Sequence, residues 1–215
     1  MGDEKSWLID ELVDRTVRAL RSNFFDAVCF DTRSDLIDAV VGLVEPGMEI
    51  GLGGSMTVRL DLGLSEKIAE RGGVILDHWQ AGLSKEENLA VRRRQLTCDL
   101  FIASANAITE KGEIVNVDGV GNRVAGTIFG PKKVVIIAGY NKIVPDLNGA
   151  MERLKQVAGP MNAKRLHLSA LPCAKTGYCH DCRSEERMCR VICIMQRRPS
   201  LTDLSIFLLK EDIGF

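Results

Sequence analysis

Residues 104–123, SANAITEKGEIVNVDGVGNR, hold the polar loop around which we expect the rest of the fold to assemble. The middle of the stretch places Asn116, Asp118, Asn122 and Arg123 around two glycines, in a space too short for a helix. Glycine allows positive φ and a close approach of the backbone, so a ligand can lie against peptide N–H groups while the side chains bind it directly. A long β-hairpin with an Asn/Gly turn is the structural alternative. Because an acidic and a basic side chain flank the same glycines, we favour a ligand-binding loop.

Strand and helix patterns alternate on either side of this loop. We expect residues 113–117 and 124–128 to pair across it as a hairpin. Further strands are predicted at residues 27–30, 48–52, 74–76, 100–103, 134–138 and 204–209. Helices are predicted at residues 6–22, 34–44, 56–70, 85–96, 146–158 and 184–197. This order predicts an α/β fold in which an open, mainly parallel sheet carries helices on both faces.

Length and charge narrow the class of protein. The 215 residues suit a single domain over residues 1–215, with residues 171–197 as a Cys-rich segment before the last strand. The chain has 28 Lys and Arg residues and 29 Asp and Glu residues, so it lacks the excess of positive charge that binds nucleic acid, and we expect no nucleic-acid partner. We interpret the three arginines at 92–94 as a solvated helix face. No apolar run approaches the roughly 20 residues that span a bilayer. We therefore expect a cytoplasmic protein without a membrane span.

A glycine turn joins the predicted strand at 48–52 to the next helix, in the sequence MEIGLGGSMT. Unpaired N–H groups at a helix N-terminus attract phosphate or carboxylate, and Ser55 or Thr57 adds a hydroxyl. The pattern is neither a P-loop nor a G-x-G-x-x-G fingerprint. A plain structural turn is the alternative.

Several polar residues follow other predicted strands and should meet this turn. In an open parallel sheet, ligands lie beyond the carboxyl ends of the strands. There we expect His78 to serve as an acid or base and Asp118 as a general base or hydroxyl acceptor. The residues predicted to bind the ligand are Gly53, Gly54, Ser55, Thr57, Asn106, Asn116, Asn122, Arg123, Asn141 and Lys142.

Five of the seven cysteines lie close together: Cys173, Cys179, Cys182, Cys189 and Cys193. A two-residue gap lets the thiolates of Cys179 and Cys182 turn toward one cation, and Cys189 and Cys193 would face one way on the predicted helix. Four sulfurs would suit zinc or an iron–sulfur cluster, although the bacterial ferredoxin spacing is absent. Unliganded thiols and a disulfide switch are the alternatives.

Taken together, the motifs resemble the LUD family, whose name refers to lactate utilisation. The resemblance covers residues 45–165 densely and extends over nearly the whole length. The motifs that carry it are GLGGSMT at 51–57, SANAIT at 104–109 with Gly112, NVDG at 116–119, GNRVA at 121–125, GP at 130–131, GYNKIV at 139–144 and PMNAKR at 160–165.

This resemblance implies a fold similar to ribose-5-phosphate isomerase, glucosamine-6-phosphate deaminase and CoA-transferases, in which a loop similar to 51–57 cradles phosphate. It also implies a role in the oxidation of lactate or similar organic acids, beside iron–sulfur partner subunits. The Cys-rich ending resembles that of stand-alone LUD proteins and differs from the tandem ferredoxin pattern of the iron–sulfur partner.

Three functions are compatible with these features. The first is a LUD protein of organic-acid metabolism that binds a small anionic metabolite, a carboxylate or phosphate. The second is a non-catalytic metal-binding redox subunit or sensor that docks an iron–sulfur oxidoreductase. The third, a sugar-phosphate isomerase or CoA-transferase, depends on the likeness of fold. Further copies of the chain are an additional expected partner.

Overall fold

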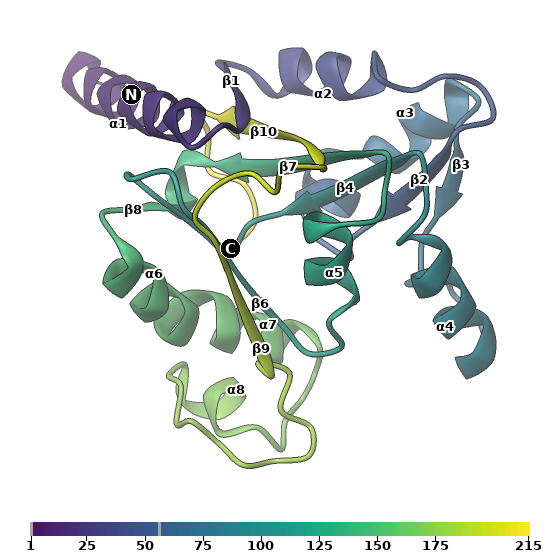
Figure 1. Cartoon of the computed structure of the whole chain (residues 1–215). Helices are drawn as coiled ribbons and strands as arrows, with labels where there is room; N and C mark the ends of the chain where they lie inside the picture. Colours follow the sequence, from purple (N-terminus) through teal and green to yellow (C-terminus); the bar gives the residue numbers. More distant parts are fainter. Residues whose placement is uncertain (1, 56) are drawn as a thin grey trace.

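The computed structural model describes residues 2–55 and 57–215, with the side chains of residues 59 and 60 excepted. A six-stranded parallel sheet forms its centre, in the order β1-β10-β7-β4-β2-β3 (Figure 1). The strands are β1 (Asp26–Phe30), β2 (Glu49–Leu52), β3 (Val74–Leu76), β4 (Leu100–Ser104), β7 (Lys133–Gly139) and β10 (Asp203–Leu209). The predicted open parallel α/β sheet is confirmed.

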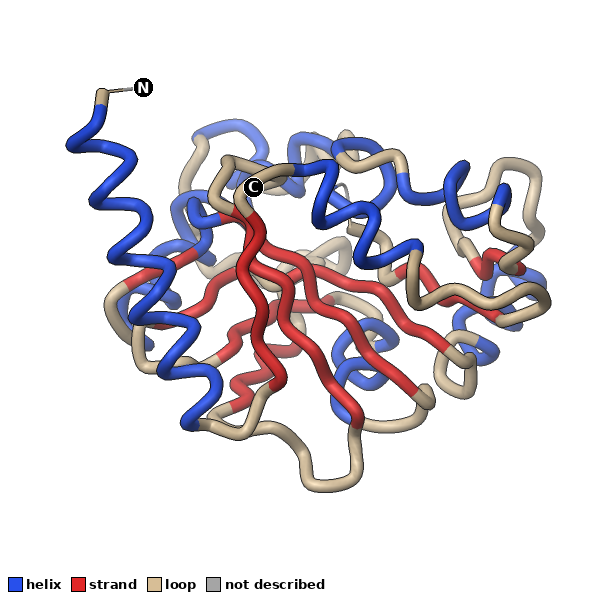
Figure 2. Tube along the Cα trace, turned by 90° about the horizontal axis from the view of Figure 1, so that it is seen from above, coloured by secondary structure: helices blue, strands red, loops and turns tan. Residues whose placement is uncertain are grey.

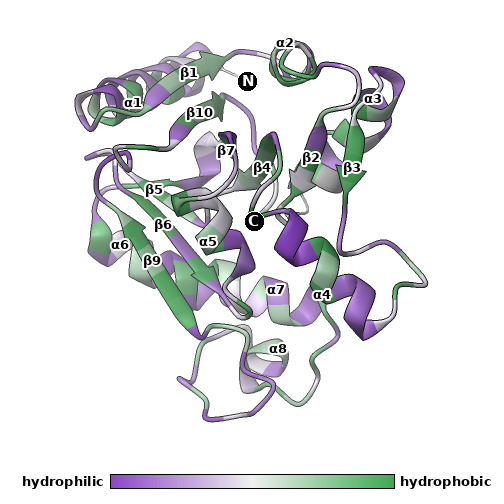
Figure 3. Ribbon diagram, turned by 45° about the vertical axis from the view of Figure 1, so that its right-hand side comes forward, coloured by the Kyte–Doolittle hydropathy of each residue, from purple (hydrophilic) through white to green (hydrophobic). Residues whose placement is uncertain are grey.

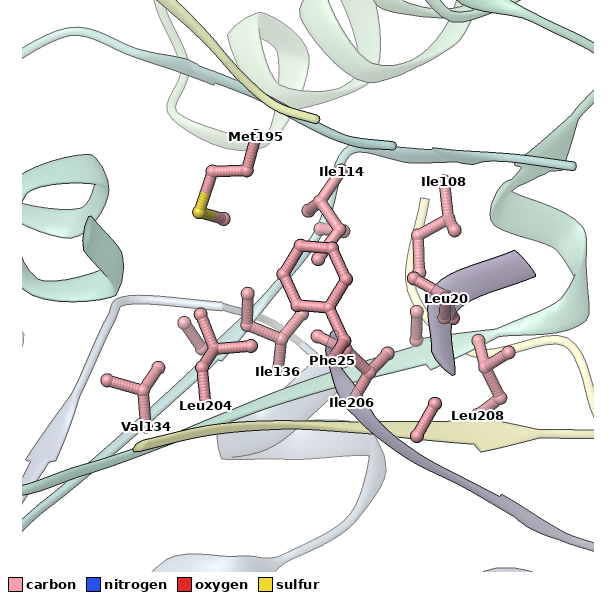
Figure 4. Close-up of a cluster of buried hydrophobic side chains, with 14 of the residues drawn as sticks. Leu20, Phe25, Ile108, Ile114, Val134, Ile136, Met195, Leu204, Ile206 and Leu208 are labelled. Carbon is pink, nitrogen blue, oxygen red and sulfur yellow. The ribbon is translucent and has the colours of Figure 1, made fainter. Parts of the chain in front are cut away.

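Helices cover both faces of this sheet because its central strands are apolar on both sides. Along β7, Val134, Ile136 and Ala138 point into one buried cluster, and Val135 and Ile137 point into the other. The first cluster packs against α1 (Asp3–Ser22) and is drawn in Figure 4; the second packs against α2 (Arg33–Val41) and α3 (Leu64–Glu70). Figure 2 shows the parallel strands fanned beside α1.

A second, smaller sheet lies beside the first, in the order β8-β5-β6-β9. Its strands are β5 (Ala107–Thr109), β6 (Ile114–Asp118), β8 (Ile143–Val144) and β9 (Val191–Met195). β6 is antiparallel to both β5 and β9. The prediction that residues 113–117 pair with residues 124–128 is therefore wrong, because β6 takes both of its partners from elsewhere.

Residues 124–128 belong instead to a helix, α5 (Asn122–Ile128). Gly121, at φ 93°, turns the chain into the helix. The carboxylate of Asp118 then accepts hydrogen bonds from the backbone N–H groups of Arg123 and Val124. Satisfying these first-turn donors favours the helix despite its β-branched residues.

The helix predicted at residues 184–197 is also wrong. After a turn at 184–187 the chain enters β9, which pairs with β6 over five positions, including Cys193 opposite Asn116. Between β8 and β9 the chain forms four short helices: α6 (Leu147–Arg153), η3 (Leu154–Ala158), α7 (Gly159–Arg165) and α8 (Pro172–Thr176). Cys189 and Cys193 thus do not share a helix face.

The remaining elements follow the predicted order. The helix predicted at 56–70 is split into η1 (Thr57–Asp61) and α3, and its first residue, Met56, lies outside the described residues. α4 (Lys85–Arg94) opens with a capping box between Ser84 and Glu87. η2 (Tyr140–Lys142) follows β7. Within residues 2–55 and 57–215, no helix is both long and apolar enough to cross a membrane.

Candidate functional site

A cavity of about 280 Å³ lies where the turns that follow β2 and β4 meet the second sheet. We call it the anion cavity. Figure 3 shows α4, α5 and α7 arranged around this end of the molecule, with the last residues of the chain among them. Of the residues predicted from sequence, the cavity is lined by Gly53, Gly54, Ser55, Thr57, His78, Asn106, Asp118, Asn122, Arg123 and Lys142.

Two predicted ligand-binding residues lie behind the wall instead of lining it. The side-chain oxygen of Asn116, which is buried, accepts a hydrogen bond from the backbone N–H of Asn106 at 3.1 Å. Asn141 donates to the carbonyl of Gly214 and accepts from the N–H of Ile213. Both side-chain amides hydrogen-bond to neighbouring backbone, and they therefore hold the residues around the cavity in place.

Arg123 is a largely buried cation that lines the cavity. Its side chain is 15% exposed, and Nη2 donates to the side-chain oxygen of Asn106 at 3.0 Å and to the carbonyl of Val117. Nη1 has no hydrogen-bond partner among the described residues. Burial lowers the pKa of the guanidinium, and the nearby carboxylate of Asp118 opposes that shift. An arginine remains protonated in such a site and can bind an anion directly.

Asp118 uses both carboxylate oxygens to bind backbone. Oδ1 accepts from the N–H groups of Gly119 at 2.7 Å and Val120 at 3.3 Å. Oδ2 accepts from those of Arg123 at 3.1 Å and Val124 at 3.2 Å and lies 4.0 Å from Nε of Arg123. These contacts shape the loop and hold Arg123; the role of Asp118 as a general base stays a prediction.

Lys142 is almost completely buried, with 2% of its surface exposed. Its Nζ donates to Oγ of Ser104 at 2.8 Å and to Oγ1 of Thr57 at 3.3 Å. Burial, followed by repulsion from Arg153 and Arg123, lowers the pKa of the amine to about 7. The side chain is therefore partly neutral near neutral pH.

His78 also lines the cavity, and Gln95 fixes its ring. Nε2 of Gln95 is 3.1 Å from Nδ1 of His78 and also donates to the carbonyls of Leu52 and Leu76. A methyl group added to Gly54 would lie 3.2 Å from Nε2 of His78. The ring and the glycine turn therefore border the same space.

Two lining residues that add positive charge, Arg92 and Arg165, were not predicted from the sequence as site residues. Arg92 donates to the side-chain oxygen of Asn122 at 2.8 Å, so it is half-buried and faces the cavity, contrary to the predicted solvated face. Arg165 lies with its guanidinium carbon 5.4 Å from the ring centroid of Trp79. The motif at 160–165 contains Arg165, but nothing in its spacing indicates that it faces the glycine turn.

Charge is unevenly distributed around the cavity. Of the described residues that line it, three are arginines, namely Arg92, Arg123 and Arg165, and Lys142 adds a partly protonated amine, whereas Asp118 supplies the one carboxylate side chain. That carboxylate is already engaged by backbone N–H groups. The cavity is therefore complementary to a small anion.

Four of the clustered cysteines line a second cavity, of about 270 Å³, which we call the thiol cavity: Cys173, Cys179, Cys182 and Cys189. Burial, and then the proximity of the other three thiols, raises the pKa of Cys173. Within the described part of the chain, no three His, Cys, Asp or Glu side chains are arranged to hold a metal ion as they stand. Cys193 lies in β9 and does not line the thiol cavity. Burial raises its pKa, and the nearby charge of Arg123 offsets part of that rise.

Arg187 ties the loops of the thiol cavity together. It donates from Nε to the carbonyl of Cys189 at 2.9 Å and from Nη1 to that of Cys182 at 2.8 Å, and it forms an ion pair with Asp181. The N–H of Asp181 points at the sulfur of Cys179, at 3.4 Å. A guanidinium and an N–H group in these positions would stabilise negative charge on nearby sulfur.

These features define a class of protein: a parallel α/β domain that has a cationic cavity beyond the carboxyl ends of its strands. The model of the LUD domain family matches residues 13–209, and the chain therefore belongs to this family. A crystal structure described as that of a DUF162 family protein from Deinococcus radiodurans has a similar fold, with a TM-score of 0.52 and 10% sequence identity over 94% of this chain and 98% of that one. No curated protein matches the chain in sequence.

Proposed function

We propose that the anion cavity binds a small organic anion, a carboxylate of lactate or related organic-acid metabolism, or a phosphate. The observation that carries this proposal is the excess of cationic side chains over carboxylates around the cavity. Membership of the LUD domain family supports the proposal.

The contacts of Arg123 support direct binding of the ligand. Because Nη2 is held by Asn106 and Val117, the guanidinium is fixed in position while Nη1 is left for a ligand. The turn at Gly53 and Gly54 brings backbone close to the same space, since a Cβ on Gly53 would lie 3.3 Å from Cγ of Arg123. Guanidinium and peptide N–H groups together suit a carboxylate or phosphate.

Isothermal titration calorimetry with lactate, pyruvate and inorganic phosphate tests the proposal. Arg123→Ala removes a charged hydrogen-bonding partner, so it should weaken binding roughly 10- to 100-fold. Arg92→Gln, which removes a half-buried cation that already donates to Asn122, should weaken it less. Arg93→Ala is the matched control, because Arg93 is the exposed neighbour on the same helix. Failure of the wild-type protein to bind any of the three anions would refute the proposal, as would unchanged affinity in Arg123→Ala.

A second proposal concerns the thiol cavity. We propose that Cys173, Cys179, Cys182 and Cys189 close around a zinc ion or an iron–sulfur cluster, giving a non-catalytic redox or sensor segment that docks an iron–sulfur oxidoreductase. Four thiolates suit either group. Their common cavity and the position of Arg187 support this choice, and the thiols would have to move closer together on binding.

Elemental analysis of anaerobically purified protein, together with an absorption spectrum, tests the second proposal. We expect one zinc ion, or iron with sulfide and broad visible absorption, per chain. Cys173→Ser should lose the metal, whereas Cys193→Ser, the matched control outside the cavity, should retain it. Wild-type protein without metal, or equal metal loss in both variants, would contradict the proposal.

The geometry gives less support to a sugar-phosphate isomerase or CoA-transferase. Such an enzyme needs a catalytic carboxylate that is free to reach its substrate. Asp118 lines the cavity with both oxygens bound to backbone, and the carboxylate of Glu113 accepts a hydrogen bond from Thr109 at 2.6 Å. Anion binding is the function that these contacts favour.

A further inference from the structure

We infer that Lys142 is a nucleophile that forms an imine with the carbonyl carbon of a small 2-oxo acid bound in the anion cavity. This inference deepens the proposed function and rests on it. It specifies that the preferred carboxylates carry a carbonyl group next to the acid, and it makes Lys142 a catalytic residue that touches the substrate.

The hydroxyl groups around Lys142 leave its lone pair available for attack. Ser104 donates its own hydroxyl hydrogen to the carbonyl of Ala105, so it accepts a hydrogen bond from Nζ, and Oγ1 of Thr57 accepts a second one. A neutral amine has two N–H groups and one lone pair. If both N–H groups serve these hydroxyls, the lone pair remains for a bond to carbon.

Charges on the surrounding elements favour this neutral form. Arg153 on α6 and Arg123 on α5 repel an ammonium group, and Asp61 on η1 attracts it more weakly. Among the described residues, Lys142 has no ion-pair partner, and the carboxylate of Asp61 accepts a hydrogen bond from the N–H of Gly214. Arg153 is itself held by the carbonyls of Asn106 and Asn141. Burial, together with these charges, lowers the pKa of Lys142, and a lowered pKa is the usual requirement for a lysine nucleophile.

The neighbouring cations would also orient the substrate. The N–H of Gly53 is used by the carbonyl of Ile102, so Arg123 and the N–H groups of Gly54 and Ser55 would bind the carboxylate, and Nζ of Lys142 would then face the adjacent carbonyl carbon. The amine attacks this carbon, a C–N bond forms, and one proton passes from nitrogen to the carbonyl oxygen. Uptake of one further proton from solvent releases that oxygen as water and leaves a protonated imine. No oxidant or reductant is required, and the ligand carboxylate offsets the new positive charge.

Reductive trapping with pyruvate tests the inference on the full-length protein. Pyruvate and sodium cyanoborohydride are added at pH 7, and the time course of labelling at each lysine is followed by peptide mass spectrometry. An exposed lysine is about 0.1% neutral or less at this pH, whereas Lys142 is neutral in a large share of molecules, so its label should appear roughly 100-fold faster or more. This preference should shrink as the pH rises toward 10.

Variants and a competitor complete the test. Lys142→Met should abolish the fast label, and Lys164→Met, at an exposed lysine on α7, should leave it unchanged. Lactate, which has no carbonyl carbon to attack, should slow the labelling of Lys142 by competition. Mapping the label in the wild-type protein makes the result independent of how well Lys142→Met folds.

The outcomes separate this inference from the proposed function. Calorimetric binding of lactate or pyruvate without preferential labelling of Lys142 would overturn the imine and leave anion binding intact. Labelling confined to exposed lysines, or labelling of Lys142 that excess lactate does not slow, would also overturn it. Absence of any anion binding in calorimetry would refute the proposed function itself.

Discussion

Replacing Asp118 with asparagine removes one carboxylate oxygen from a cap that serves four backbone N–H groups. Each oxygen accepts from two of these groups, so either orientation of the asparagine amide leaves two N–H groups facing an NH₂ group. The NH₂ group should turn toward Gly119 and Val120, because Val120 is exposed and water can replace the lost acceptor there. The substitution also removes the charge beside Arg123.

The loss of stability follows from these contacts. Two N–H groups without a good acceptor cost about 1 kcal/mol each at the lower end of the range, and losing the charge weakens the remaining bonds by roughly a further 1 kcal/mol. We therefore expect Asp118→Asn to lower the free energy of unfolding by about 2–4 kcal/mol. For a domain of this length, the melting temperature should fall by roughly 5–15 °C.

Urea denaturation followed by far-UV circular dichroism measures the change. Asp146→Asn is the matched control, because Asp146 caps α6 through a single N–H group, that of Gly149, and asparagine caps helices as well as aspartate does. That control should lose less than about 0.5 kcal/mol. If Asp118→Asn were no less stable than the control, the account of Asp118 as the organiser of the loop would be refuted.

Three further substitutions test the packing and the buried amine. Gly112→Ala places a Cβ at φ 78° and 2.6 Å from the backbone of Ala19, so it should destabilise the protein by at least about 2 kcal/mol in thermal melts. Phe101→Ala empties a fully buried site and should cost about 3–5 kcal/mol in urea titrations; a loss below about 1 kcal/mol would contradict the packing. The folded-state pKa of Lys142 is lowered to about 7, so below pH 7 the folded protein carries the full cost of a buried ammonium group, and this cost is relieved as the pH rises toward 10.5. The free energy of unfolding of the wild type should therefore rise relative to that of Lys142→Met across this range, by at most about 1.4 kcal/mol per pH unit. Parallel pH profiles of stability for the two proteins would contradict the lowered pKa of Lys142.

The sequence predicts the parallel sheet well because its strands are short apolar runs separated by clear turn signals, as at β2, β4 and β7. Local sequence patterns give the wrong secondary structure where tertiary contacts determine the conformation of the chain. The β-branched residues of 124–128 suggest a strand, but the carboxylate of Asp118 and the positive φ of Gly121 start a helix there. A helix is likewise predicted at residues 184–197, whereas pairing with β6 makes residues 191–195 an extended strand.

The candidate site shows the same limit. Gly53, Arg123 and Lys142 could be grouped in advance because each follows a predicted strand or glycine turn, and parallel strands end at one edge. Arg92 and Arg165 could not, because their place depends on how α4 and α7 lie against the loops. That Lys142 is buried between two hydroxyl groups likewise follows from tertiary packing, to which a single sequence gives no direct signal.

The two cavities have a partition in common: Val117, Gly159, Met188 and Cys189 line both. The backbone of Met188 lies so close to Gly119 that a methyl group there would come within 2.8 Å of its carbonyl oxygen. Movement of Cys189 toward a metal would thus also move part of the lining of the anion cavity. By thermodynamic linkage, any change that metal loading makes in acid affinity must be matched by an equal change in metal affinity when the acid is present.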